Sequence, residues 1–363
     1  MAKLLFDNFK REINQIREYI LHTQLTNEFA ACALQDESVR KGYTKGIDER
    51  IKSLSKHYKR FRTNKRIFEY KAAIISLYGL LEKTIEECIK EYLEEISVIV
   101  TEYEKLDIKL QENHFDLSLK LISIIAAKDF AKYQHLKKED VLRKLGVCID
   151  NLPSYKINAE AFTLSSGNLK HSKITDLFKF LNIDLNMELK SNEAFVAYLQ
   201  DRYELRDISQ LKLDFLYSKI DDLVIRRNAI AHGSGDVDAI LDFSEIEPYI
   251  EFIESYCHAI FEILTKEIIK NEIVHQCQVM GIIEDVIDNK ILIVRTSDLF
   301  LSIGDEVIIE NSVGKLFKKT VEEIQIDKVS RATISIREET RVGIKLSSGF
   351  PKIKENCKFY ARI

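Results

Sequence analysis

The sequence predicts a mainly α-helical protein that ends in a small antiparallel β-barrel. Two observations predict this fold class. Apolar residues recur every three or four positions up to about residue 272, and short β-branched runs separated by turns follow residue 275. The 363 residues exceed what one hydrophobic core usually serves, so two domains are the starting expectation. The patterns divide the chain into an N-terminal helical extension with a basic patch (1–66), a helical domain (67–274) and a β-barrel domain (275–363).

Two long amphipathic helices are the clearest elements of the helical region. Residues 71–100 place apolar side chains three or four apart over about seven turns. Ser244-Glu245-Ile246-Glu247 has the form of a capping box, with Pro248 tolerated in the first turn, and a second apolar stripe runs over residues 250–268. We expect both helices to lie in the core.

The C-terminal region is expected to close into an antiparallel barrel, because it holds several short strands and no helical run. Turn residues, most of them Gly, Asn, Asp and Ser, separate these strands. The expected strands are residues 279–287, 291–295, 306–310, 332–336, 342–346 and 359–363.

Composition and targeting signals predict a cytoplasmic protein with no cofactor, no metal and no membrane partner. The net charge of −4 means that any polyanion site must be a local patch. The six cysteines include no C-x-x-C pair, and no H-E-x-x-H, P-loop or G-x-S-x-G motif occurs. Charged residues interrupt the N-terminus before a signal-peptide core could form, and residues 72–81, the longest apolar stretch, fall short of the roughly 20 residues that span a membrane.

Residues 40–66 form a basic segment, with eleven Lys and Arg against Asp48 and Glu49 alone. Tyr58 and Phe61 lie among these charges, and RNA bases can stack on such rings. A solvated helix face or a linker would show the same composition, so the segment specifies no chemistry by itself. The candidate RNA-binding residues are Lys56, Lys59, Arg60, Arg62, Lys65 and Arg66.

Residues 221–233, with the sequence DDLVIRRNAIAHG, carry the candidate chemistry. The expected buried stripe of this helix leads directly to Arg227, so a guanidinium continues the apolar face; the stripe consists of Leu213, Leu216, Ile220 and Leu223 or Val224. A charge in that place costs several kcal/mol unless it is paired or the face opens into a site. Arg226, in contrast, follows Asp222 by four residues and is expected to be its solvated partner.

Asn228 and His232 are four residues apart beside Arg227, and Gly233 is expected to end the helix. The helix dipole favours an imidazolium at this end. Such a set suits attack on a phosphodiester, because His can move a proton and Arg can hold the oxygens of the phosphorane. The 2′-hydroxyl of RNA would be the nucleophile, so no metal is needed.

A structural interpretation fits the same spacing, and spacing alone favours it. Arg227 could pair with a carboxylate of a neighbouring helix, and Glu82 and Glu86 are available. His232, placed before a helix-ending glycine, could do no more than cap backbone carbonyls.

The motif Arg227-Asn228-x-x-x-His232-Gly233 resembles the R-x4-6-H motif of the HEPN superfamily, in which a polar residue, often Asn, follows the Arg. Two further segments resemble prokaryotic HEPN proteins of the RiboL-PSP type. Residues 75–83 are similar to their first core helix, with its aromatic residue and Glu, and residues 166–169 (SGNL) precede a second similar segment at 174–184. The resemblance covers roughly residues 68–271.

The resemblance implies a helical bundle that forms a homodimer, with two R-x4-H motifs facing one cleft. Many members look like metal-independent endoribonucleases of toxin–antitoxin, abortive-infection and antiviral defence systems. It implies that Arg227 and His232 are catalytic, that Asn228 supports them and that Glu82 orients Arg227. The expected partners are RNA (tRNA, rRNA or mRNA), a second copy of the chain and an antitoxin or sensor. Some members carry a regulatory Tyr two residues after the His; Ser234 stands there in this chain, which puts that control in doubt.

One alternative accompanies this interpretation. Some HEPN domains only bind, so a non-catalytic RNA- or partner-binding module is the second functional hypothesis.

In the barrel, residues 302–307 (SIGDEV), 342–346 (VGIKL) and 358–360 (KFY) look like the second domain of translation elongation factors. That resemblance implies docking to a ribosome, tRNA or protein, so the barrel would select the target and leave the chemistry to the helices. A purely structural barrel would show the same turn glycines and alternation.

Overall fold

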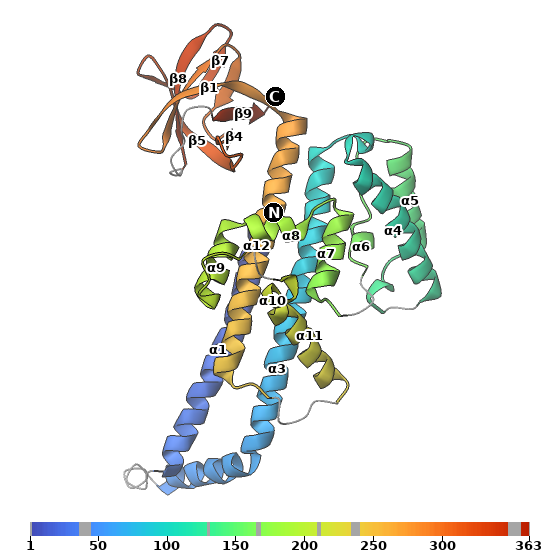
Figure 1. Cartoon of the computed structure of the whole chain (residues 1–363), viewed down its shortest axis with the longest axis vertical. Helices are drawn as coiled ribbons and strands as arrows, with labels where there is room; N and C mark the ends of the chain where they lie inside the picture. The colour runs from blue at the N-terminus through green and yellow to red at the C-terminus, as the bar shows by residue number, and fades with distance from the viewer. Residues whose placement is uncertain are drawn as a thin grey trace. The chain divides into compact units, whose positions relative to one another are not determined.

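The computed structural model confirms the predicted fold class: a mainly helical chain followed by a closed antiparallel β-barrel (Figure 1). The structure describes residues 2–35, 45–128, 131–164, 168–208, 212–233, 240–347 and 357–362. The chain divides into two compact units. The first contains Met1–Leu93, Asp107–Gly146 and Ile157–Ile263, and the second contains Glu94–Leu106, Val147–Lys156 and Leu264–Ile363.

The helices follow one another through both units, and two of them are much longer than the stretches of apolar periodicity that predict them. They are α1 (Ala2–Gln35), α3 (Lys45–Ile99), α4 (Ile108–Ala127), α5 (Lys138–Ile149), α6 (Ala159–Phe162), α7 (His171–Phe180), α8 (Leu185–Ser191), α9 (Glu193–Tyr203), α10 (Leu213–Leu216), α11 (Ser218–Ala231) and α12 (Phe243–Gln276). Short 3-10 helices η1 (Tyr103–Lys105) and η2 (Ala131–Tyr133) lie on either side of α4 in the sequence.

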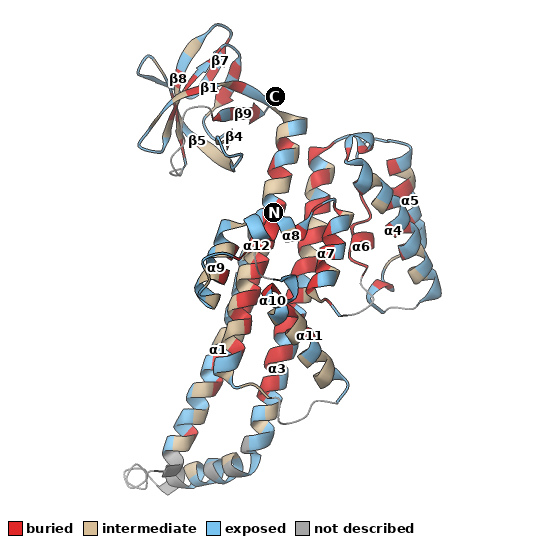
Figure 2. Cartoon of the chain, in the orientation of Figure 1, coloured by how far each residue is buried: buried red, intermediate tan, exposed pale blue. Residues whose placement is uncertain are grey.

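The two predicted core helices are confirmed as parts of α3 and α12. Figure 2 shows buried residues along much of both helices. In α3 the side chains of Ile74, Leu81 and Ile85 are fully buried, and Ile253 and Ile260 are their counterparts in α12. Because α3 begins at Lys45, the basic segment from that residue onward is continuous with the core helix.

The start of α12 corrects the expected capping box. The backbone N–H of Asp242 donates to the Oε2 atom of Glu245 at 2.7 Å, so the box begins at Asp242 and not at Ser244. The helix starts at Phe243, which places Pro248 in its second turn. Glu247 is used differently: it accepts from Arg17 of α1 at 3.0 Å.

The barrel is a six-stranded ring with the order β4-β9-β1-β2-β8-β5, closed by pairing of β4 with β5. Strand β6 pairs antiparallel with β5 outside the ring, and β3 pairs with β7 in a separate two-stranded sheet. The strands are β1 (Cys277–Ile287), β2 (Ile291–Thr296), β3 (Leu299–Ser302), β4 (Glu306–Glu310), β5 (Leu316–Ile326), β6 (Val329–Arg331), β7 (Thr333–Ile336), β8 (Thr340–Leu346) and β9 (Lys358–Arg362). All six expected runs are therefore strands, whereas β3, β5 and β6 are additional.

A buried carboxylate joins the end of α12 to the barrel within the second unit. Glu272 is only 4% exposed and accepts from Lys318 of β5 at 2.8 Å and 3.0 Å and from Arg362 of β9 at 3.0 Å. The Glu272 carboxylate loses its contact with water on burial, and two cations from two strands compensate its negative charge.

Candidate functional site

The candidate catalytic residues lie in the last turns and at the end of helix α11, and the earlier turns of this helix are buried in the core. Ile220, Leu223 and Val224 are fully buried, as the expected stripe predicts. Leu216 of the same stripe is buried too, but it lies on the separate helix α10, where Leu213 is 38% exposed, so the prediction for Leu213 was wrong. Arg227 follows on the same side and is half-buried. Its guanidinium carbon lies 4.7 Å from the centre of the Tyr78 ring of α3, and its Nη1 atom donates to the Oδ1 atom of Asn228 at 3.1 Å. An aromatic face and an amide therefore hold the charge in place.

Tyr78 connects Arg227 to a third segment of the chain. The ring is 3% exposed, and its hydroxyl oxygen accepts a hydrogen bond from the backbone N–H of Leu169 at 3.1 Å. Burial raises the pKa of Tyr78, so the hydroxyl stays protonated. The three segments with family resemblance thus meet at one place, although Ser166 and Gly167 of the middle segment lie outside the described residues.

Glu82 lies one turn beyond Tyr78 on α3 and is half-buried. Burial, together with the neighbouring Glu86 carboxylate, raises the pKa of Glu82, while Lys132 and Arg227 act in the opposite direction. Glu86 forms an ion pair with Lys132 of η2. Within the described part of the chain no carboxylate forms an ion pair with Arg227, so the Arg227–Glu82 and Arg227–Glu86 pairs of the structural interpretation are absent there.

Arg226 has the partner that its spacing predicts. Its Nε atom donates to Asp222 at 2.6 Å, and Asp222 also accepts from the Tyr249 hydroxyl of α12. The Nη1 atom of Arg226 donates to the hydroxyl oxygen of Tyr70 of α3 at 3.2 Å. The pair is more than a solvated contact, because it ties α11 to both α3 and α12 next to Arg227.

His232 ends α11. Its backbone N–H donates to the carbonyl oxygen of Asn228 at 2.9 Å, and Gly233 follows with φ of +68°, the left-handed conformation of a helix-ending glycine. The His232 side chain is exposed, and within the described structure it shares no hydrogen bond with Arg227. Ser234, where some family members have Tyr, lies outside the described residues.

The basic segment is only partly available as a free cationic surface. Lys56 and Arg60 are exposed on α3, whereas Arg66 forms an ion pair with Asp242 at the start of α12. Lys65 donates to the Oδ1 atom of Asn27 of α1 at 2.8 Å. Lys59 and Arg62 also belong to α3, but their side chains lie outside the described part of the structure.

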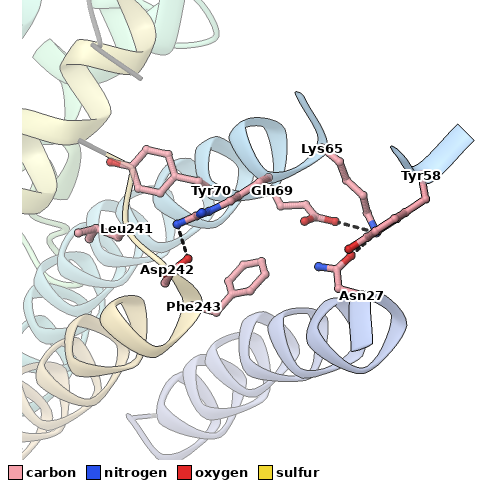
Figure 3. A pocket seen from close by; sticks show the side chains of 9 residues that line it. Asn27, Tyr58, Lys65, Glu69, Tyr70, Leu241, Asp242 and Phe243 are labelled. Atoms are coloured by element: carbon pink, nitrogen blue, oxygen red, sulfur yellow. Dashed lines mark hydrogen bonds and ion pairs between the residues drawn. The ribbon is translucent and has the colours of Figure 1, made fainter. Parts of the chain in front are cut away.

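These engaged cations surround a pocket that sequence reasoning did not anticipate. The pocket has a volume of about 200 Å³ and lies between α1, α3 and the start of α12 (Figure 3). Its walls include Asn27, Tyr58, Lys65, Glu69, Tyr70 and Phe243. No single motif could have predicted it, because three helices far apart in the sequence supply its residues.

A second unanticipated feature is a group of buried polar contacts around His171, which is hydrogen-bonded to α11. The ring nitrogens of His171 lie 3.0 Å from the Tyr256 hydroxyl and 2.8 Å from the Asn186 Oδ1 atom, and the ring stacks on Tyr217 at 3.4 Å between centroids. Its backbone N–H donates to Asp221 of α11 at 3.0 Å. Burial lowers the pKa of His171, and both ring nitrogens have partners, so this residue is a satisfied core histidine.

The fold and the site together define a helical domain in which an R-x4-H motif closes a helix packed on an aromatic-bearing core helix. The chain belongs to the RiboL-PSP-HEPN family, whose sequence model matches residues 45–266, more than half of the chain. Domains of this family are generally ribonucleases or RNA-binding modules. The match includes Tyr78, Glu82, Arg227 and His232, and it begins at the first residue of α3.

The other comparisons add little. No curated protein matches the chain. Among solved structures, the chain is similar to the "C-terminal domain of Geobacillus thermoleovorans putative U32 peptidase", crystallised as its selenomethionine variant. The two are 14% identical, with a TM-score of 0.19, over 23% of this chain and 99% of that chain, which is too limited a likeness to bear on function. The resemblance of the barrel to elongation factors is not confirmed.

The described residues also bear on membranes and metals. No helix among them is long and apolar enough to cross a membrane. They also contain no group of three or more His, Cys, Asp or Glu side chains arranged to hold a metal ion.

Proposed function

We propose that this protein is an endoribonuclease that cleaves RNA by attack of the 2′-hydroxyl, with Arg227 and His232 as its catalytic residues. The observation that carries the proposal is the environment of Arg227. Its guanidinium is held by a ring and an amide, and no carboxylate of the described chain neutralises it. A guanidinium has five N–H donors in a planar fork, so donors remain for the oxygens of a phosphate.

The proposed reaction uses side chains for every step. His232 removes the 2′-hydroxyl proton, the 2′-oxygen attacks the phosphorus, and the 5′-oxygen leaves with a proton, which gives a 2′,3′-cyclic phosphate. Arg227 stabilises the charge on the non-bridging oxygens. Asn228 positions Arg227 through the 3.1 Å hydrogen bond. The Glu82 carboxylate attracts the Arg227 guanidinium electrostatically and not through a direct contact.

The reaction needs a base and an acid, and one chain supplies one R-x4-H motif. We therefore propose a homodimer in which two copies bring two His232 and two Arg227 side chains to one composite cleft. The exposure of His232 at the end of α11 supports this arrangement, since its ring is accessible to a second chain.

We further propose a cytoplasmic defence role, as a toxin or abortive-infection effector restrained by an antitoxin or sensor. The family membership supports this proposal. The barrel would select the target, through a ribosome, an RNA or a protein, while the helical region carries the chemistry.

The test is cleavage of total RNA by the purified protein in the presence and absence of a chelator. We expect cleavage in both conditions, and losses of at least 10²-fold for His232→Ala and Arg227→Ala. His22→Ala and Arg337→Ala, which change exposed residues outside the R-x4-H motif, are the matched controls. Activity that requires an added divalent ion would contradict the metal-free mechanism.

One observation favours the alternative of a non-catalytic binding module: the His232 ring has no hydrogen-bond partner that orients it within the described chain. Binding without cleavage over a range of pH would support that alternative. Growth arrest on expression, abolished by His232→Ala, would support the nuclease.

A further inference from the structure

The pocket between α1, α3 and α12 has the composition of a binding site for one planar, hydrogen-bonding ring. Its volume of about 200 Å³ is below the roughly 300–1,000 Å³ of sites for drug-sized ligands. Tyr58, Tyr70 and Phe243 provide aromatic walls. Aromatic rings of this kind stack on unpaired bases without regard to sequence, so the space and the walls suit a single nucleobase.

The polar groups of the pocket add selectivity to this stacking surface. Glu69 is 5% exposed, and its Oε1 atom lies 3.4 Å from the Lys65 Nζ atom. A carboxylate accepts hydrogen bonds and donates none. Asn27 uses its oxygen for Lys65, and its amide nitrogen lies on the side of Phe243 in Figure 3. The pocket therefore offers a two-oxygen acceptor beside an N–H donor.

We propose that this pocket binds one unpaired guanine of the RNA strand and so determines where the protein cuts. Guanine carries an imino N–H and an amino group side by side, which the two oxygens of Glu69 can accept together, and its O6 atom can accept from Asn27. The inference rests on the proposed function only in taking RNA as the ligand.

The position of the pocket agrees with this role. Tyr70, which lines it, accepts a hydrogen bond from Arg226, the residue next to Arg227. On α3, Tyr70 lies eight residues before Tyr78, about 12 Å along the helix axis. Lys56 and Arg60 are exposed further along the same helix, where they can contact phosphates on the far side of the bound base.

The experiment uses the absence of tryptophan from the chain. Phe243→Trp in the full-length protein introduces one fluorophore at the pocket wall. Its emission is titrated with GMP, UMP and two octanucleotides with 2′-O-methyl groups, which have no free 2′-hydroxyl and are not cleaved: all uridine, and uridine with one central guanosine. We expect saturable quenching by the guanosine octamer at a concentration at least tenfold lower than for the uridine octamer or GMP.

Three variants in the Phe243→Trp background complete the test. Glu69→Gln and Asn27→Ala should each weaken binding of the guanosine octamer about tenfold and leave the uridine octamer unchanged. Glu94→Gln, an exposed carboxylate on the same helix, should change neither. Thermal melting of each variant confirms that it is folded. The two pocket substitutions lie on different helices, so if one variant fails to fold, the other still tests the proposal.

Equal midpoints for the two octamers, or no quenching by any ligand, would overturn the proposal and leave the pocket as a packing gap. Binding of GMP as tight as the guanosine octamer would overturn the assignment to an RNA strand in favour of a free nucleotide. These outcomes are independent of the proposed function, since uncleavable RNA is used. Guanine binding without nuclease activity would refute the proposed nuclease function and leave the guanine site standing. Cleavage that depends on His232 but shows no base preference would refute the guanine site and leave the nuclease function standing.

Discussion

Substitution of Tyr78 separates the two contacts that its side chain makes. Tyr78→Phe keeps the ring under the Arg227 guanidinium and removes only the hydroxyl that accepts from the Leu169 N–H. The N–H is buried with Leu169, so leaving it without a partner should cost about 1–3 kcal/mol of unfolding free energy. Tyr78→Leu removes the hydroxyl and the aromatic face together.

The two variants should therefore differ in activity. Without the ring, Arg227 loses a cation–π contact worth roughly 0.5–2 kcal/mol and the surface that fixes its direction. We expect Tyr78→Phe to cleave RNA within about threefold of the parent, and Tyr78→Leu to lose about tenfold in kcat/KM, equivalent to about 1.4 kcal/mol.

Urea denaturation measures the stability of both variants, and initial rates on one RNA measure their activity. All rates are taken at a temperature where each variant is folded. Parental activity of both the Phe and the Leu variant would refute the role of the ring as the platform for Arg227. A Tyr78→Phe variant as impaired as Tyr78→Leu would assign the effect to the hydroxyl and the Leu169 segment.

Three further predictions concern the scaffold. Burial lowers the pKa of His114 to about 4, below the value of about 6.5 of an unfolded chain; the folded state thus excludes the proton, and stability present above pH 6.5 should fall by up to about 3 kcal/mol between pH 6.5 and 4, with a flatter profile in His114→Gln. Glu272→Gln should lower the unfolding free energy by about 1–3 kcal/mol, seen as a lower melting temperature, because two cations lose their shared carboxylate. Gly281→Ala should destabilise by about 1–3 kcal/mol in urea, since a Cβ atom there collides with the backbone of β2, whereas Gly343→Ala, which meets nothing closer than 3.8 Å, should not.

Periodicity predicted the elements whose burial follows one face. The stripe through Ile74 and Leu81 identifies α3, and alternation identifies β2, whose residues Leu292 and Val294 are fully buried. Strand β5 (LFKKTVEEIQI) was missed because its charged side chains stay partly exposed and mask the alternation. The capping box at α12 was misplaced by two residues because Asp242 and Ser244 are both good capping residues and are both followed by Glu three positions later.

The candidate site depended on tertiary contacts to a greater extent. Spacing identified Arg227 as an inward charge and suggested Glu82 or Glu86 as its partner, whereas the structure places Tyr78 against it. The family segment at 75–83 contained that aromatic residue, but its role needs the packing of α11 on α3. The pocket beside Tyr70 left no sequence signal, since its walls come from three helices.

Cleavage of one RNA oligonucleotide and of the same oligonucleotide with a single 2′-deoxy sugar at the cut position tests whether the 2′-hydroxyl is the nucleophile. The purified protein is incubated with each in EDTA, and the products are analysed by mass spectrometry. We expect a 2′,3′-cyclic phosphate from the RNA, no cut at the deoxy position, and no product with His232→Ala. Cleavage at the deoxy position at the rate of the unmodified RNA, or full activity of His232→Ala, would contradict the proposed mechanism.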